Sequence, residues 1–482
     1  MWLLILSVTI LLIKQSFSLA PLNTKPFGDD FLVGVSTAAP SAEGAWDQDG
    51  KSEDIWNRVV KTNPEFITDR SSSDISANGY NLVEQDVEIL NFLGVRHSRI
   101  SLSWSRILPN GVSDYINMKA IDHYKKLFEL YRENQIEPFV TLYYWDLPQS
   151  LQDLGGFRNE SFVQWFKDYA KVCFEHFGQQ VKFWSTFNDP LQICVGGYGY
   201  GYLAPALKDP GVGEYICGHN LLKAHAAAYH LYEKSFRDVQ GGRISINLGS
   251  NWFEPKSDSK EDREASERQM EFVMGWFAHP IYWGNYPPKM VQRMRERSPD
   301  GPSRLPVFTK KEIDFVKGTH DYFSLNYQNT LYVESALTLP FLPRSFESDA
   351  GVRITDVEGD DTFGIKKLLV WIKQHYNNPS IIITENSYGT PNRNLEDSDR
   401  IEYIKRVLSN VKDAIDYQHV RCYGYTYKSP HDSWEWTEGY SVKNGLFDVD
   451  FDSEQKTRTP RKSASFYQYF AKYGCIVEPC PY

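Results

Sequence analysis

The sequence has few cysteines, no run of basic residues and, beyond its N-terminus, no long apolar segment. Six cysteines among 482 residues do not define a disulfide scaffold, and none has the Cys-x-x-Cys spacing of a zinc site. The formal net charge is −10 and Lys and Arg form no stripe, so we expect no nucleic-acid partner. No Gly-rich phosphate-binding loop and no histidine pair with metal-ligand spacing is present, so we expect no cofactor and no metal.

The first 20 residues have the length and composition of a secretory signal peptide. Residues 2–13 are almost entirely apolar, and small residues follow at Ser16, Ser18 and Ala20. The run is too short to span a membrane comfortably, although it lacks the usual Lys or Arg before it. We therefore expect residues 1–20 to be removed, leaving residues 21–482 as one secreted domain without a stable membrane anchor.

An oxidising compartment permits disulfides and glycans. Cys475 and Cys480 lie near the C-terminus with a proline between them, which predicts a disulfide in the tail. The other four cysteines have apolar neighbours, and we expect them to be core thiols: Cys173, Cys194, Cys217 and Cys422. The sequon Asn159-Glu160-Ser161 follows a Gly-Gly pair, which predicts a surface turn with a glycan on Asn159.

Short β-rich runs alternate with longer amphipathic segments along the whole chain. The segments between the runs, such as "FVQWFKDYAKVCFEHFG", have apolar residues at helical spacing. We expect the polar residues 257–267 and 345–361 to form external loops. The eight predicted strands are 31–37, 96–104, 137–145, 181–188, 243–250, 322–330, 380–387 and 421–428. Eight such units without a break in composition predict a single (β/α)8 barrel of the α/β class.

The last residues of these strands are unusually polar and aromatic. In a (β/α)8 barrel the active site lies at the carboxyl ends of the strands. The residues at these ends are Arg99, Tyr144, Trp145, Asn188, Asp189, Asn326, Glu385, Asn386 and Lys428. The sequence therefore predicts that these side chains share one end of the barrel.

Several blocks, in the right order, resemble glycoside hydrolase family 1 over roughly residues 25–470. These blocks are "SRISLSWSRILP", "VTLYYWDLPQSLQDLGGF", "WSTFNDP", "IIITENSYG" and "DSWEWTEGYSVKNGLFDVDF". Details such as "GWFAHPIYWGNYPP" are most similar to the insect members. The resemblance implies the same barrel and retaining hydrolysis of glycosides.

Two carboxyl groups about 5–5.5 Å apart carry out this chemistry, one as nucleophile and one as acid and base. The resemblance implies that Glu385 is the nucleophile and that Arg99 keeps it ionised. The acid/base position is occupied by Asp189, where the family usually has Glu. Asp is one methylene shorter, and a misplacement of about 1 Å can cost about 100-fold in rate. General acid catalysis is worth about 10²–10⁴, so we expect Asp189 to be a weakened acid.

The positions that hold glucose in the family are also altered. The family's Gln is replaced by Ser41, its His by Tyr144, its Tyr near the nucleophile by Gln328, its stacking Trp by Lys428 and an aromatic by Asn444. Four sugar-contacting positions are retained: Asn188, Asn326, Glu435 and Trp436. A site that loses a hydrogen-bond partner can discriminate by about 10⁴–10⁵. We therefore expect ordinary glucosides to be poor substrates.

Three functions remain open at this point. The first is a secreted hydrolase that acts on an unusual β-glycoside through Glu385 and Asp189. The second is a barrel recruited to a different acid/base reaction on a small metabolite, such as transfer, cyclisation, isomerisation or elimination. The third is a ligand-binding protein without turnover, in which Lys428 fills the site by pairing with Glu435 or Glu385.

Overall fold

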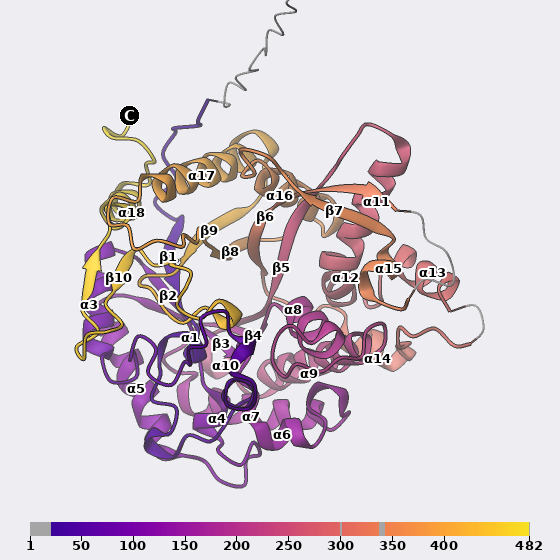
Figure 1. Cartoon of the computed structure of the whole chain (residues 1–482), viewed down its shortest axis with the longest axis horizontal. Coiled ribbons are helices and arrows are strands. Elements are labelled where there is room, and N and C mark those ends of the chain that lie inside the picture. The colour runs from indigo at the N-terminus through magenta and orange to yellow at the C-terminus, as the bar shows by residue number, and fades with distance from the viewer. Residues whose placement is uncertain (1–20, 299–300, 337–342, 482) are drawn as a thin grey trace, which may run out of the picture.

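The computed structural model describes residues 21–298, 301–336 and 343–481. Its centre is a closed ring of parallel strands (Figure 1). In chain order the ring strands are β1 (Leu32–Ser36), β2 (His97–Ser101), β3 (Glu137–Tyr143), β4 (Phe183–Asn188), β5 (Arg243–Pro255), β6 (Phe323–Ser335), β8 (Ile381–Asn386) and β9 (Cys422–Lys428). Neighbouring strands pair in this order, β9 pairs with β1, and the β5–β6 pairing completes the ring. The predicted single (β/α)8 barrel is confirmed.

Helices surround the strands (Figure 1). The longer ones are α2 (Ile55–Thr62), α3 (Val83–Leu93), α5 (Met118–Glu133), α7 (Phe162–Phe177), α9 (Gly213–Ser235), α12 (Trp276–Trp283), α13 (Pro288–Glu296), α16 (Gly364–His375), α17 (Ser398–Gln418) and α18 (Lys462–Tyr473). In α7, Phe162, Phe166, Tyr169 and Cys173 recur every three or four residues and are fully buried. Burial of each large apolar side chain contributes about 1.5–3 kcal/mol, so this spacing fixes which face meets the barrel.

Shorter helices lie between these elements and at the ends of the strands. They are α1 (Ala39–Ala42), α4 (Trp104–Ile107), α6 (Gln149–Asp153), α8 (Pro190–Cys194), α10 (Arg237–Gln240), α14 (Lys310–Val316) and α15 (Phe346–Ala350). A separate two-stranded sheet pairs β10 (Phe447–Val449) with β11 (Arg458–Pro460).

Both segments that we expected to be external loops contain regular structure. Residues 257–267 include the start of α11 (Lys260–Met270), which the side chain of Ser259 caps and which packs on β5 and β6. Residues 345–361 include α15 and an additional strand, β7 (Val352–Asp356), which pairs antiparallel with β6. These predictions were wrong because β5 and β6 extend beyond the ring, and their extensions give the polar segments a surface to pack on.

One expectation about the cysteines was also wrong. Cys194 and Cys217 form a disulfide, although both are fully buried as the apolar neighbours suggested. The sequence could not predict this pair because the two residues are 23 positions apart on different helices, α8 and α9. Cys475 and Cys480 form the predicted disulfide, and Cys173 and Cys422 are buried free thiols.

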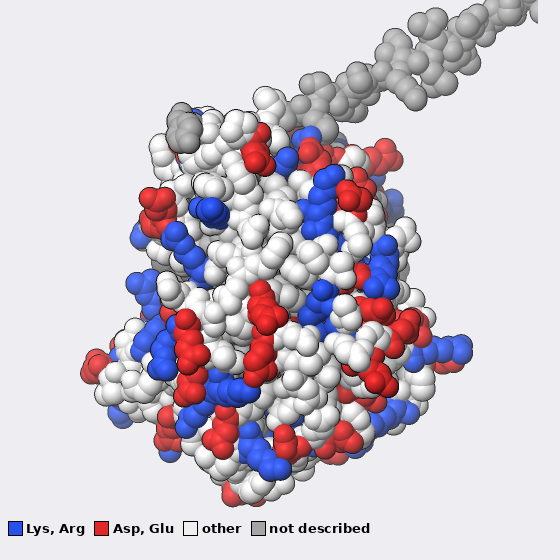
Figure 2. Space-filling model, turned by 90° about the vertical axis from the view of Figure 1, so that its left-hand side faces the viewer, with Lys and Arg blue, Asp and Glu red and all other residues white. Residues whose placement is uncertain are grey.

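Figure 2 shows basic and acidic side chains interspersed on one face of the molecule, without a single-sign patch. Among the residues that the structure describes, no helix is both long and apolar enough to cross a membrane. The predicted signal peptide, residues 1–20, lies outside the described residues. Asn159 is partly exposed and follows a short 3-10 turn, Gly156–Arg158, as the sequon suggested, while its glycosylation stays a prediction.

Candidate active site

The parallel register brings the predicted site residues to one end of the ring, which we call the barrel mouth. Ser36, the last residue of β1, is level with Arg99 on one side and Lys428 on the other. Asn326 of β6 is level with Glu385 of β8. Because parallel strands all end at the same edge, side chains from distant parts of the sequence meet here.

Glu385 is the centre of this cluster and is 8% exposed. Its Oε2 accepts a hydrogen bond from Arg99 Nη1 at 2.8 Å, and the Tyr144 hydroxyl lies 2.9 Å from Oε2 and 3.1 Å from Oε1. Burial alone would raise the pKa of Glu385, but the charges of Lys428 and Arg99 and the hydrogen bonds outweigh it and lower the pKa. Glu385 is therefore held as a carboxylate.

Asparagine and threonine side chains fix Arg99 and Glu385 in place. Arg99 donates to the Asn188 side-chain oxygen, which also accepts from Asn326 Nδ2 at 2.8 Å. The Asn326 oxygen in turn accepts from the Thr384 hydroxyl at 2.9 Å. This chain crosses β2, β4, β6 and β8, so four strands determine the orientation of the guanidinium beside Glu385.

Lys428 and Tyr144 occupy the space around the carboxylate of Glu385. Lys428 Nζ lies 3.1 Å from Glu435 Oε2 and 3.8 Å from Glu385 Oε1. Burial would lower the pKa of Lys428, but Glu435 first and then Tyr144 and Glu385 raise it, so the ammonium is charged. The Tyr144 ring stacks on Trp436 with centroids 5.4 Å apart. Tyr144 and Lys428, the residues at the positions of the family's His and Trp, thus contact the carboxylates of Glu385 and Glu435.

Asp189 follows the end of β4 and is 7% exposed. Its backbone has φ 49° and ψ 67°, in the left-handed region that Asp tolerates better than most residues. Its N–H donates to the backbone oxygen of Asn247 on β5 at 3.0 Å. A Cβ on Gly249 of β5 would lie 2.5 Å from Asp189 Oδ2, so only glycine there leaves room for the carboxyl group.

The pKa values of Asp189 and Glu385 move in opposite directions. Burial, and then the negative charge of Glu385, raise the pKa of Asp189 to about 7. At pH values between the ordinary pKa of a glutamate and about 7, Asp189 is therefore mostly protonated while Glu385 is ionised. When the pKa values of two neighbouring carboxyl groups differ in this way, one group can act as the acid and the other as the nucleophile or base.

Two of the predicted binding residues lie outside the immediate surroundings of Glu385. Ser41, on α1, is buried and donates its hydroxyl hydrogen to the backbone oxygen of Trp434 at 2.5 Å. Its oxygen lies 3.0 Å from Ser433 Oγ, which donates to Glu435. Gln328 is exposed and lines a pocket whose wall includes Asp189 but not Glu385.

Some residues of this network were not identified from the sequence. Ser433, Thr384 and Thr141 are small hydroxyl side chains that support Glu435, Asn326 and Arg99. Thr384 precedes Glu385 and Ser433 is two residues before Glu435, so proximity in sequence was the available signal. Thr141 lies in the middle of a predicted strand and gave no signal of this role.

A pocket of about 170 Å³ opens on the side of Asp189. Nine of its 17 lining residues are apolar or aromatic, and the polar ones besides Asp189 include Ser250, Asn251, Gln269 and Glu347. The lining includes Gln192, Gln328, Tyr200, Tyr202, Phe253, Val273, Leu331, Phe346 and Ile354. Residues of β6, β7 and α15 contribute to it, so the segment that we expected to be a loop forms part of this wall.

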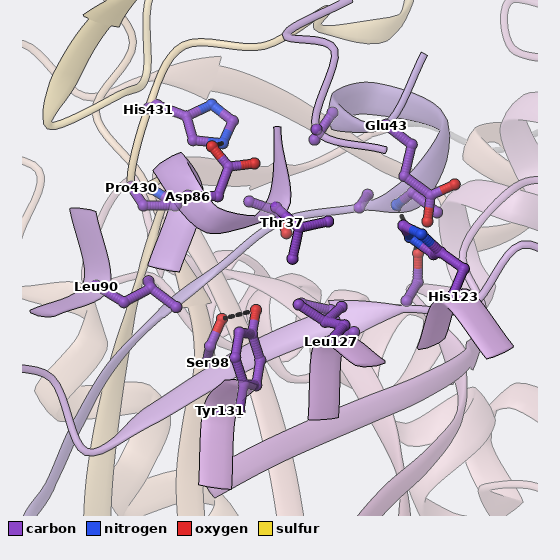
Figure 3. Close-up of a pocket in the computed structure, with 17 residues that line it drawn as sticks. Thr37, Glu43, Asp86, Leu90, Ser98, His123, Leu127, Tyr131, Pro430 and His431 are labelled. Atoms are coloured by element: carbon purple, nitrogen blue, oxygen red, sulfur yellow. Dashed lines mark hydrogen bonds and ion pairs between the residues drawn. The ribbon is translucent and has the colours of Figure 1, made fainter. Parts of the chain in front are cut away.

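Figure 3 shows a second cavity, whose lining residues differ from those around Glu385. It is lined by β2, α3, α5 and the loop after β9, and it does not include Glu385 or Asp189. Its carboxylates already have protein partners, because Glu43 pairs with Arg106 at 3.2 Å and Asp86 pairs with Arg458 at 2.8 Å. These pairs are consistent with a structural role. Among the described residues, no group of His, Cys, Asp and Glu side chains could hold a metal ion.

Comparisons with known proteins give one consistent result. The sequence profile of glycosyl hydrolase family 1 matches residues 23–474. Myrosinase 1 of Brevicoryne brassicae is 40% identical over 93% of this chain and 99% of that protein. The cytosolic beta-glucosidase of Cavia porcellus is 36% identical over 94% of this chain and 99% of that protein. The solved structure of aphid myrosinase covers 93% of this chain with a TM-score of 0.90 and 39% identity.

Proposed function

The chain belongs to glycosyl hydrolase family 1 and shares its O-glycosyl hydrolase chemistry, and from this premise we propose that it is a secreted retaining hydrolase of an unusual β-glycoside. In this proposal Glu385 attacks the anomeric carbon and Asp189 protonates the leaving oxygen, then activates water. The observation that carries the proposal is the opposed titration of the two carboxyl groups, with Glu385 below its ordinary pKa and Asp189 raised to about 7.

The proposed substrate differs from a plain glucoside on the sugar side. Tyr144 and Lys428 contact Glu385 and Glu435, which leaves less room and fewer free hydrogen-bonding groups for sugar hydroxyls. On the other side of Asp189, the aromatic and aliphatic residues of the pocket suit a largely apolar leaving group, and Gln192, Gln328 and Glu347 offer polar contacts to it. We therefore propose a glycoside whose sugar tolerates a cation and a phenol near the anomeric centre and whose aglycone is apolar.

The test is covalent trapping with 2-deoxy-2-fluoro β-glycosides that carry a 2,4-dinitrophenyl leaving group. Such leaving groups need little protonation, so the weakened acid does not prevent attack. A panel of gluco, galacto, manno and xylo sugars is incubated with the purified protein, and the peptide that contains Glu385 is analysed by mass spectrometry. Labelling of Glu385 by any sugar is the expected result, and no labelling by all of them contradicts the proposal.

The two pKa shifts predict a bell-shaped dependence of kcat/KM on pH. Asp189 must be protonated to act as an acid, so activity falls as pH rises through about 7. Glu385 must be ionised, so activity falls on the acid side only below the ordinary pKa of a glutamate. The check is a comparison of phenyl and dinitrophenyl glycosides in wild type and Asp189→Asn. For the phenyl glycoside, kcat/KM of the wild type should fall strongly as the pH rises through about 7, and for the dinitrophenyl glycoside it should fall only slightly. In Asp189→Asn this fall should be absent.

Tyr144→Phe is expected to move the acid limb of that profile to higher pH. The Tyr144 hydroxyl is one of the groups that lower the pKa of Glu385, and it touches both carboxylate oxygens. A hydrogen bond to a charged group is worth about 1.5–3 kcal/mol, and one pKa unit corresponds to about 1.4 kcal/mol. The matched control is Tyr143→Phe at the preceding residue, since Tyr143 packs on Phe157 and Phe187 instead. Equal profiles for the two variants would contradict this role.

A second candidate function is binding of a glycoside or related metabolite without turnover. The specific observation in its favour is the ion pair of Lys428 with Glu435, which occupies the space of the family's stacking Trp. Under this function no fluoro-glycoside labels Glu385, while sugars or metabolites still raise the thermal stability of the protein. The trapping experiment therefore separates the two candidates.

Secretion is part of the proposal. It is supported by the apolar residues 2–13 followed by small residues, and by the two disulfides of the described residues. Expression of the full chain in insect cells should place the protein in the medium, with an N-terminus near residue 21 and a glycan on Asn159. Retention of residues 1–20 in the mature protein would contradict it.

A further inference from the structure

The short helix α8 begins directly after Asp189. It comprises five residues, Pro190–Cys194, and continues directly into a π-helical segment, Val195–Tyr200; helical segments shorter than about 12–15 residues are marginally stable by themselves in water. Its position must therefore come from what holds it from outside. Since the residue before it is the candidate acid, whatever holds α8 also influences where that carboxyl group lies.

Both the backbone and the side chain of Asp189 accept hydrogen bonds from N–H groups of α8. Its carbonyl oxygen accepts from the N–H of Ile193 at 3.1 Å, and its Oδ1 accepts from the N–H of Gln192 at 3.5 Å. Asp189 is thus the N-cap residue of α8. A shift of the helix would move both donors, and the carboxyl group would follow them or lose them.

The C-terminal end of α8 is attached covalently to the outer ring of helices. Cys194, the last residue of α8, is bonded to Cys217 of α9, and both are fully buried. α9 in turn packs along α7. One end of α8 is therefore fixed by the β4 strand and the other by a disulfide to a long, well-packed helix.

We propose that the Cys194–Cys217 disulfide positions Asp189 by fixing α8, and so is part of the acid function rather than only a source of stability. The inference rests on the proposed role of Asp189. Positional accuracy matters more here than for a glutamate, because the shorter side chain cannot compensate by rotating about an extra bond. A displacement of about 1 Å is enough to cost about 100-fold in rate.

The experiment compares two disulfide knock-outs, Cys194→Ala/Cys217→Ala and Cys475→Ala/Cys480→Ala. The second removes the C-terminal disulfide, which is far from Asp189 in sequence and serves as the matched control. In the first variant, the ratio of kcat/KM for phenyl to dinitrophenyl glycoside should fall about tenfold or more, because only phenol needs the acid. In the control the ratio should equal that of wild type.

A readout that needs no turnover accompanies the kinetics. The carboxyl carbons of aspartate are labelled with ¹³C, and the Asp189 signal is assigned by its loss in Asp189→Asn. Because burial is the main cause of the raised pKa, a looser α8 that admits water should lower the pKa of Asp189 from about 7 by about one unit or more. The C-terminal knock-out should leave this pKa unchanged.

Gly249→Ala should displace the Asp189 carboxyl group without changing either disulfide, because the added Cβ would clash with that group. It should reproduce the lowered ratio with both disulfides intact. If Gly249→Ala changes the ratio while Cys194→Ala/Cys217→Ala changes only the melting temperature, the disulfide is merely structural and the inference is overturned. If wild type neither labels nor turns over any glycoside, the proposed function fails, and the NMR titration alone decides the positioning.

Discussion

Asp189→Glu combined with Lys428→Trp is expected to raise the hydrolysis of 4-nitrophenyl β-D-glucoside by about 100-fold or more. The first change returns the missing methylene, and a correction of about 1 Å is worth about 100-fold. The second removes an ammonium that lies 3.1 Å from Glu435 and 3.8 Å from Glu385. It also returns a stacking surface, worth about 1–3 kcal/mol by analogy with base–aromatic stacking.

Lys428 is expected to oppose glycoside cleavage for an electrostatic reason as well. The transition state resembles an oxocarbenium ion and carries positive charge at the sugar ring. With Arg99 and Lys428 both charged, the two cations balance Glu385 and Glu435, so the cluster has no net negative charge to offer that ring. Removal of the Lys428 ammonium leaves the cluster with a net charge of −1, which stabilises the positive charge that develops on the sugar ring.

The control for this gain is Asp189→Asn with Lys428→Trp, which restores the stacking surface but has no proton to donate. It should hydrolyse the dinitrophenyl glucoside faster than wild type, yet gain little on the 4-nitrophenyl glucoside. Initial rates at pH 6 for both substrates separate the two contributions. If the Asp189→Glu/Lys428→Trp variant is no faster than wild type, the altered residues are not what limits glucoside hydrolysis.

Glu385→Gln is expected to abolish covalent labelling and to reduce turnover by about 10⁴-fold or more, which is the size of loss seen when a covalent nucleophile is removed. An amide keeps the shape of the side chain but cannot form the glycosyl-enzyme. The measurement is intact-protein mass after incubation with the fluoro-glycoside that labels wild type, together with kcat for the matching dinitrophenyl glycoside.

Glu438→Gln is the matched control for the nucleophile. Glu438 lies in the loop after Glu435 but is exposed, and its side chain lies near the Ser441 hydroxyl. Its variant should label and turn over like wild type. Residual labelling of Glu385→Gln at another carboxylate would show that the attacking group had been assigned to the wrong strand.

Much of the fold could be predicted because burial imposes a period on the sequence. The helical spacing of Phe162, Phe166 and Tyr169 identified α7, and short apolar runs identified the eight ring strands. The loop predictions for residues 257–267 and 345–361 failed because both segments pack on the extended strands β5 and β6. α11 and β7 contain few apolar residues; α11 packs against the extended ends of β5 and β6, and β7 pairs with that of β6.

Much of the candidate site could be predicted because parallel strands of a barrel end together. The polar residues toward the carboxyl ends of the strands were enough to place Arg99, Asn188 and Glu385 at one edge, and in the structure Arg99 contacts both of the others. The roles of these residues stay predictions. Sequence could not place Gln328, which lines the pocket that includes Asp189 and not Glu385.

The sequence by itself determined the barrel and most of the side chains at its mouth, because local periodicity and strand order suffice for these, and its resemblance to the family rests on specific blocks such as "WSTFNDP" and "IIITENSYG". Only the tertiary structure decided how those side chains pair. It joins Lys428 to Glu435, turns the Tyr144 hydroxyl onto Glu385 and links α8 to α9 through Cys194 and Cys217. These choices depend on distances between residues far apart in the chain, and a buried charge takes whichever opposite charge the folded backbone brings within reach.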